Sequence, residues 1–152
     1  MGGHKPTPSE DAPPMGNPMD FVTPSEFVML PSRGRYPEGH PLHGEESIEI
    51  KYMTAKEEDI LTSPSLLSKG IALDRLISSV VLDKSINTAS LLPCDRNAVL
   101  IAARITGFGP DYESGYVCPL CGAEGEATFD LNDHEIVSAT PEELAENGIE
   151  SR

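Results

Sequence analysis

The sequence is short of basic residues and has no long apolar run. Its 152 residues include 11 Lys and Arg against 25 Asp and Glu, which gives a formal net charge of −14. Such an excess of negative charge opposes attraction to phosphate backbones and to anionic membrane surfaces, so the composition disfavours a general nucleic-acid-binding protein. Because there is no apolar run of about 18 residues and no signal-peptide-like start, we expect a soluble protein without membrane contacts, made in the cytosol.

Sequence signatures of common enzyme classes are also missing. There is no P-loop motif, no GxSxG nucleophile elbow and no HExxH zinc-protease motif. Cys94 stands next to Asp95 and has no histidine near it in sequence, which disfavours a role as an activated nucleophile. The sequence therefore predicts a protein that is not an enzyme and that binds no small-molecule substrate.

The three cysteines do not form a disulfide framework, because their number is odd and two of them are separated by only two residues. The motif from Cys118 to Cys121, followed by Gly122, is typical of the knuckle of a zinc ribbon, in which two thiolates bind one tetrahedral ion. A structural zinc site needs four ligands, and the chain has no second CxxC motif. Zinc is thus a possible cofactor if further ligands come from Cys94, His134, or His40 with His43; the alternative is a surface turn without metal.

Prolines are concentrated at the start of the chain, where nine of the 14 lie within the first 44 residues. Proline removes backbone donors and favours extended geometry. We therefore expect residues 1–44 to form an extended Pro- and Gly-rich arm that is ordered mainly on partner proteins. Apolar residues near its end could dock on the folded part or on another subunit, and the expected interface consists of Phe21, Phe27, Met29, Leu30, Arg33 and Arg35.

Residues 45–109 carry most of the regular hydrophobic periodicity. Alternation predicts a strand over 47–53, and Thr54 with Glu57 forms a capping box for a helix ending near Leu61, whose first-turn carboxylates should face water. A stripe of apolar residues predicts a second helix over 71–82. A third helix over 95–106, with Asp95 as its N-cap, is apolar on most sides. The expected fold is α+β: a small helical body of about three helices with an N-terminal strand.

Residues 110–152 form an acidic C-terminal segment with 11 acids and one base. We expect a small hairpin on either side of the CxxC turn. Thr140, Pro141 and Glu143 together favour a short terminal helix that ends near Asn147 and Gly148.

Four segments follow one another in a recognisable order. They are Leu30 to Gly34 with Tyr36 and Pro37, Ile48 to Leu61, Asp95 to Gly109 with Tyr112, and the CxxC motif of Cys118 and Cys121. In this order, over residues 28–122, they resemble the base plate protein family of T4-like tailed bacteriophages. The resemblance implies a component or assembly factor of the central hub of a contractile-tail baseplate, and it brings no catalytic residues.

The same resemblance implies that the partners are other phage baseplate and tail proteins, and that the protein is assembled in the host cytoplasm and located in the tail baseplate of the virion. The alternative is a small zinc-ribbon-like adaptor or accessory protein of phage transcription or replication. A ribbon that faces nucleic acid normally carries basic residues beside its cysteines, whereas this one has Glu113, Glu124 and Glu126 nearby.

Overall fold

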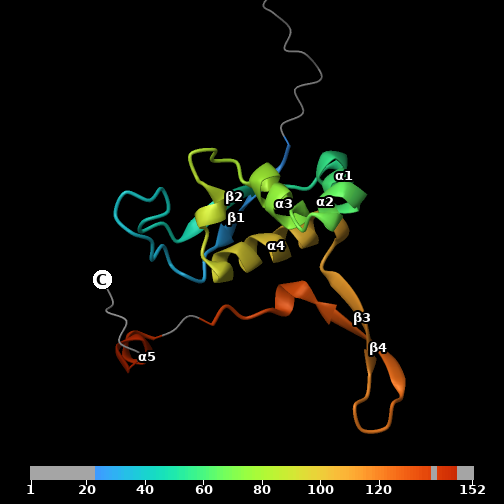
Figure 1. Cartoon of the computed structure of the whole chain (residues 1–152). Coiled ribbons are helices and arrows are strands. Elements are labelled where there is room, and N and C mark those ends of the chain that lie inside the picture. Colours follow the sequence, from blue (N-terminus) through green and yellow to red (C-terminus); the bar gives the residue numbers. More distant parts are fainter. Residues whose placement is uncertain (1–22, 138–139, 147–152) are drawn as a thin grey trace, which may run out of the picture.

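The computed structural model describes residues 23–137 and 140–146, and Figure 1 shows how they are arranged. Its helices and two separate antiparallel sheets confirm the α+β fold class. The elements are β1 (Ser25–Met29), β2 (Ser47–Lys51), α1 (Ala55–Thr62), α2 (Pro64–Ser68), α3 (Ala72–Val80), α4 (Pro93–Phe108), β3 (Asp111–Val117), β4 (Glu124–Asp130) and α5 (Pro141–Glu146), with short 3-10 turns at Thr88–Ser90 and Leu131–Asp133.

The sheet of β1 and β2 forms because each strand packs apolar residues of one face into the core. In the antiparallel register Val28 lies opposite Ile48, and both are buried. The strand predicted over 47–53 is confirmed as β2, whose second edge is extended by a bridge from Ile50 to Val81. The sequence does not predict β1, because apolar residues stand on both of its faces and hide the period-two alternation.

Helices α1 and α3 follow the local signals of the sequence. The capping box of α1 is confirmed, since the Glu57 carboxylate accepts the backbone N–H of Thr54 at 2.9 Å. Leu76, Ile77 and Val80 form the buried side of α3. Leu73, which the stripe places on the same side, is exposed.

Helix α4 packs across the core and begins earlier than the sequence indicates. Its N-cap is Leu92, and Pro93 occupies the first turn, so the prediction of Asp95 as N-cap is wrong. Asp95, Val99 and Ala103, each four residues apart, are the fully buried positions. The remaining sides of the helix are partly exposed, although the sequence is apolar on most of them.

The folded body extends well into the region expected to be an arm. Leu30, Tyr36 and Leu42 belong to the core, so a boundary at residue 44 does not separate an arm from the body. The prolines do not prevent this, because Pro31 and Pro41 follow the first residue of the hydrogen-bonded turns Leu30–Arg33 and His40–His43, where the fixed φ of proline is favourable. Residues 1–22 lie outside the described residues.

The C-terminal part begins with a long hairpin. β3 and β4 pair antiparallel from Asp111 opposite Asp130 to Val117 opposite Glu124, so the predicted hairpin around the CxxC turn is confirmed and is longer than expected. The chain then returns past β1 and α4, as Figure 1 shows. α5 begins with the predicted capping box, in which the backbone N–H of Glu143 donates to Thr140 Oγ1 at 3.2 Å. Asn147 and Gly148 lie outside the described residues.

Candidate functional site

Asp95 is fully buried and attaches the segment after β1 to helix α4. Its carboxylate accepts the backbone N–H of Ser32 at 2.9 Å, the Ser32 hydroxyl at 2.6 Å and the Tyr36 hydroxyl at 2.6 Å. Burial, followed by the hydrogen bond to Asp95, raises the pKa of Tyr36. With these partners Asp95 has a structural role: it holds the turn that presents Arg33 and Arg35 at the surface.

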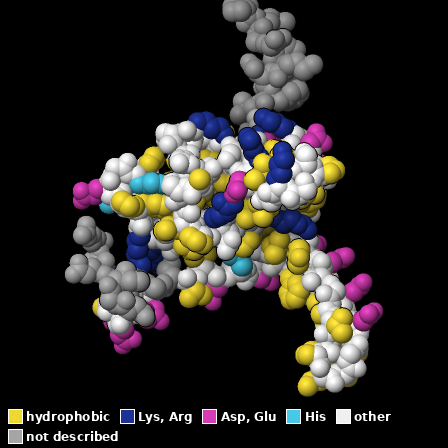
Figure 2. Space-filling model, viewed as in Figure 1, with side chains coloured by type: hydrophobic (Ala, Val, Ile, Leu, Met, Phe, Trp, Pro, Cys, Tyr) yellow, Lys and Arg dark blue, Asp and Glu magenta, His cyan; other side chains and the backbone are white. Residues whose placement is uncertain are grey.

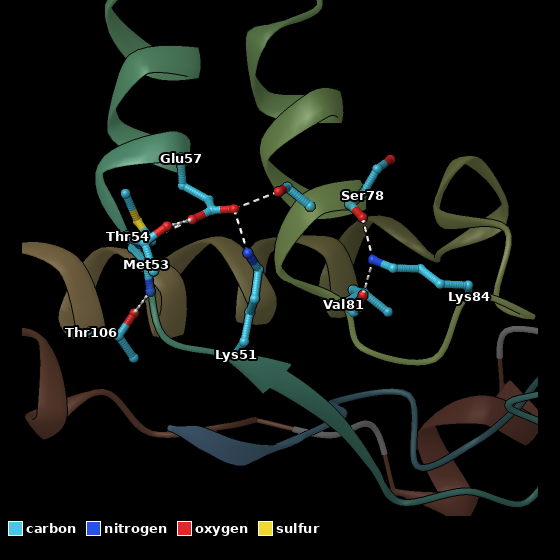
Figure 3. Close-up of polar contacts among 9 residues, drawn as sticks. Lys51, Met53, Thr54, Glu57, Ser78, Val81, Lys84 and Thr106 are labelled. Carbon is cyan, nitrogen blue, oxygen red and sulfur yellow. Dashed lines mark hydrogen bonds and ion pairs between the residues drawn. The ribbon is translucent and has the colours of Figure 1, made fainter. Parts of the chain in front are cut away.

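Glu57 is the second fully buried carboxylate, which corrects the expectation that it faces water. Figure 3 shows its contacts: Lys51 Nζ donates at 2.6 Å, and the Thr54 hydroxyl and backbone N–H donate from the helix start. Ser79 Oγ donates from α3 at 2.5 Å. Burial alone would raise the pKa of Glu57, but the hydrogen bonds from Lys51, Ser79 and Thr54 outweigh it and lower the pKa to about 2. Glu57 therefore joins β2, α1 and α3.

The outer face of β1 is the most evident candidate for contacts with other proteins. Phe27 is 71% exposed and Met29 is 53% exposed, although both stand in a regular strand. Arg33 and Arg35 are exposed in the turn that follows. Leu30, expected in the same interface, is only 2% exposed, because side chains alternate along the strand and Leu30 points into the core. Phe21 lies outside the described residues.

We call Phe27, Met29, Arg33 and Arg35 the β1 surface. In the part of the chain that the structure describes, no strand pairs with the second edge of β1, which we call its open edge. The Leu30 N–H donates to the Glu46 carbonyl, and the Tyr52 N–H donates to the Pro24 carbonyl. Because backbone groups alternate in direction along a strand, these two bonds show which residues of β1 turn their N–H and C=O groups toward β2. The N–H and C=O groups of alternate residues, including Phe27 and Met29, therefore point away from β2.

Two hollows lie next to the β1 surface. One, of about 400 Å³, is lined by Met29, Leu30, Arg33, Glu46 and Ile136. The other, of about 250 Å³, separates β1 from α4 and the chain after β4, with Ala98, Ala102 and Ile105 on the helix side. Apolar side chains line part of both hollows, which makes the region suited to receiving side chains of a partner protein.

The CxxC turn closes the tip of the β3–β4 hairpin. Cys118 N–H donates to the Ala123 carbonyl at 2.8 Å, and the Gly122 N–H donates back to the Cys118 carbonyl at 2.8 Å. Gly122 has φ 72°, which explains the glycine after the second cysteine. The backbone N–H groups of Cys121 and Leu120, and then the Cys121 thiol, lower the pKa of the Cys118 thiol. This turn carries the two cysteines that the sequence predicts as zinc ligands, and a structural zinc site would need two more.

The other candidate ligands are engaged elsewhere. His40 stacks on Tyr36 with ring centroids 4.3 Å apart, and its Nε2 donates to Ser90 Oγ at 2.8 Å. His43 Nδ1 donates to the Tyr36 carbonyl at 2.6 Å, and His134 Nδ1 donates to the Leu131 carbonyl. Burial and the neighbouring Asp95 raise the pKa of Cys94. Across residues 23–137 and 140–146, no three His, Cys, Asp or Glu side chains are grouped to hold a metal ion, so a complete zinc site is not formed within them.

Comparison with known proteins identifies the class of this molecule. The sequence model of the family described as T4 bacteriophage base plate protein matches residues 26–151, which is most of the chain. The chain therefore belongs to this family, and it is a phage baseplate protein. No curated protein and no solved structure matches it. Among the described residues, no helix has the length and apolar character needed to cross a membrane.

Proposed function

We propose that this chain is a structural or assembly protein of the hub region of a contractile-tail baseplate, and that it acts through contacts with other baseplate and tail proteins, without catalysis. Membership of the baseplate family supports the baseplate role. The observation that carries the contact-based mechanism is the exposure of Phe27 and Met29 on a regular strand. On this proposal the protein is assembled in the host cytoplasm and is located in the tail of the virion.

The β1 surface has the chemistry of a protein-binding site. Aromatic, Met and Arg side chains are enriched at the centres of interfaces, and all three types occur here within nine residues of sequence, from Phe27 to Arg35. The open backbone edge offers a partner strand hydrogen bonds, and the adjacent hollows offer its side chains pockets. The buried Asp95 network fixes the turn carrying Arg33 and Arg35, which lowers the entropic cost of binding.

A zinc-ribbon-like adaptor is the second candidate, and the form of the CxxC turn favours it. On that reading zinc would be held by Cys118, Cys121 and two further ligands from among Cys94, His134, and His40 with His43, which would have to move to the turn. Metal analysis of the purified full chain distinguishes the candidates, since the adaptor requires one zinc per chain. A zinc content well below one per chain would exclude the adaptor.

The test of the first candidate is direct binding. The purified full chain is immobilised, and the other baseplate proteins of the same phage are passed over it one at a time. We expect at least one to bind, and we expect Phe27→Ser with Met29→Ser to weaken that binding by about tenfold or more, as for interface anchors. The matched control is Leu67→Ser with Leu73→Ser, which removes two exposed apolar side chains elsewhere. Wild-type chain that binds none of these proteins would contradict the proposal.

A further inference from the structure

The register of the β3–β4 hairpin sorts its side chains by chemistry. Residues directly opposite one another share a face of the ribbon, and neighbours along a strand alternate between faces. One face contains only polar and small residues apart from three aromatic rings, Tyr112, Tyr116 and Phe129. The other face contains all five acids of the two strands, which are Asp111, Glu113, Glu124, Glu126 and Asp130.

The aromatic face is not covered by the body. Tyr112, Tyr116 and Phe129 are each between 44% and 57% exposed, and Leu120 at the tip is 95% exposed. Figure 2 shows the hairpin projecting from the body, with acidic side chains along one side and hydrophobic ones at the other side and the tip. A two-stranded hairpin with both faces in water is only marginally stable, so burial of the aromatic face on a partner would stabilise it.

Two features hold Tyr112 and Tyr116 in place before any partner binds. The Tyr116 ring covers Gly125 on the opposite strand, where an added Cβ would lie 2.7 Å from the ring. The Arg104 guanidinium lies 5.0 Å from the centroid of Phe108 and 5.9 Å from that of Tyr112, which connects the base of the hairpin to α4. Arg104 also donates to the Gly109 carbonyl at 2.9 Å. The aromatic face is therefore partly preorganised, because Tyr112 is attached to the end of α4 and Tyr116 is packed on the opposite strand.

The acidic face identifies the kind of partner. Asp111 and Asp130 lie directly opposite each other, where like charges repel, and neither strand carries a Lys or Arg. The chain beyond residue 110 holds 11 acids and one base, so it contributes most of the net charge of −14. Among the described residues no Lys or Arg forms an ion pair with these five carboxylates, which leaves the acidic face open to the cations of another molecule. A second copy of this chain is disfavoured as that molecule, because two bodies of the same large negative charge repel.

We propose that the β3–β4 hairpin is a docking element that inserts into a cleft of another baseplate protein, with an apolar wall against the aromatic face and a Lys- and Arg-rich wall against the acidic face. This inference rests on the proposed function and names a second contact, distinct from the β1 surface. The aromatic rings and Leu120 supply affinity, and the carboxylates supply fast and selective association.

The first test removes an apolar contact without disturbing the hairpin. Leu120→Ser changes a side chain that is almost fully exposed, so the variant should fold normally. Binding of the full chain to each separately purified baseplate protein of the phage is measured as before. We expect Leu120→Ser to weaken binding to one of them by about tenfold, while Leu67→Ser, a similar change on α2, leaves it within about twofold.

The second test removes charge. The triple variant Glu113→Gln, Glu124→Gln and Glu126→Gln neutralises three exposed carboxylates of one face, and Glu38→Gln, Glu45→Gln and Glu58→Gln make the same change in net charge on the body. We expect the hairpin triple to weaken binding by about tenfold at 50 mM NaCl and to differ little from wild type at 500 mM, because salt screens exposed charges. The triple variant on the body should bind as tightly as wild type at both NaCl concentrations.

The outcomes separate the two proposals. If a baseplate protein binds wild type but neither hairpin variant weakens it, the docking element is refuted while the proposed function stands. Two other results would also refute a partner with a Lys- and Arg-rich cleft. One is binding that strengthens with salt, and the other is self-association of the chain that Leu120→Ser abolishes. If no baseplate protein binds wild type at all, the proposed function itself fails.

Discussion

Glu57 joins three elements through a carboxylate that water does not reach. Because its pKa is lowered from 4.5 to about 2, its contribution to stability is complete above about pH 4.5 and is lost as the pH falls toward 2. The hydrogen bonds come from Lys51 of β2, Thr54 before α1 and Ser79 of α3. Loss of its charge should therefore loosen the packing of β2, α1 and α3 together.

We predict that Glu57→Gln lowers the free energy of unfolding by roughly 2–3 kcal/mol at pH 7, because Lys51 loses its buried partner. Between pH 4.5 and 2, the variant should lose less stability than wild type does. Urea unfolding at a series of pH values measures both effects. Glu58→Gln, an exposed neighbour in the same helix turn, is the control and should cost under about 0.5 kcal/mol. Equal effects of the two changes would show that Glu57 is not the buried anchor described.

Asp95 makes the corresponding connection on the other side of the core. We predict that Asp95→Asn costs about 3 kcal/mol, since the amide cannot accept all the hydrogen bonds from Ser32 and Tyr36. Asp74→Asn is the control: Asp74 pairs with Arg96 at the surface, and its loss should cost under about 1 kcal/mol. Thermal and urea unfolding compare the two variants. A similar small loss for both would contradict the structural role of Asp95.

At the scale of elements, the turn after β1 depends on Gly34. This residue has φ 70°, and a Cβ there would lie 2.5 Å from both the backbone N and the O of Glu45. The close approach brings residue 34 against the segment that leads into β2. No side chain larger than hydrogen fits without moving that backbone.

We predict that Gly34→Ala costs about 3 kcal/mol or more, because it combines positive φ with a backbone clash. Gly39→Ala provides the matched control: its φ is 88°, but the space around it is open, so only about 1 kcal/mol of backbone strain is expected. The free energies of unfolding of the two variants are measured and compared. If Gly39→Ala is as damaging as Gly34→Ala, the close approach is not what requires glycine at position 34.

Several elements could be predicted from the sequence because their signals are local. The capping box of Thr54 and Glu57, the apolar stripe of α3 and the hairpin around the CxxC turn each depend on residues close together in the chain. The buried roles of Glu57 and Asp95 could not be predicted in this way, since Ser79 and Ser32 are 22 and 63 residues distant from them. Pro93 at the first turn of α4 was the available signal against Asp95 as N-cap. The β1 surface could be predicted only in part, because nothing local separates exposed Met29 from buried Leu30.

At the scale of the whole molecule, the residues that the structure describes already form a continuous apolar core. Its buried apolar residues run from Val28 to Ala103. We predict that deletion of residues 1–20 changes the melting temperature by less than about 2 °C, yet weakens association with cognate tail proteins, as expected for an arm that contacts partners. Calorimetry and a binding assay on the shortened chain measure the two effects. A large fall in melting temperature would show that the segment belongs to the fold, and unchanged binding would show that it contacts no partner.

The central claim is that this chain builds the baseplate through its exposed surfaces, and it is tested most directly in the phage itself. The gene is deleted, and electron microscopy of infected-cell lysates scores complete baseplates, with plasmid copies of wild type or of Phe27→Ser with Met29→Ser supplied in trans. We predict that complete baseplates are lost, that the wild-type copy restores them and that the double variant does not. Normal numbers of complete baseplates without this protein would contradict the account.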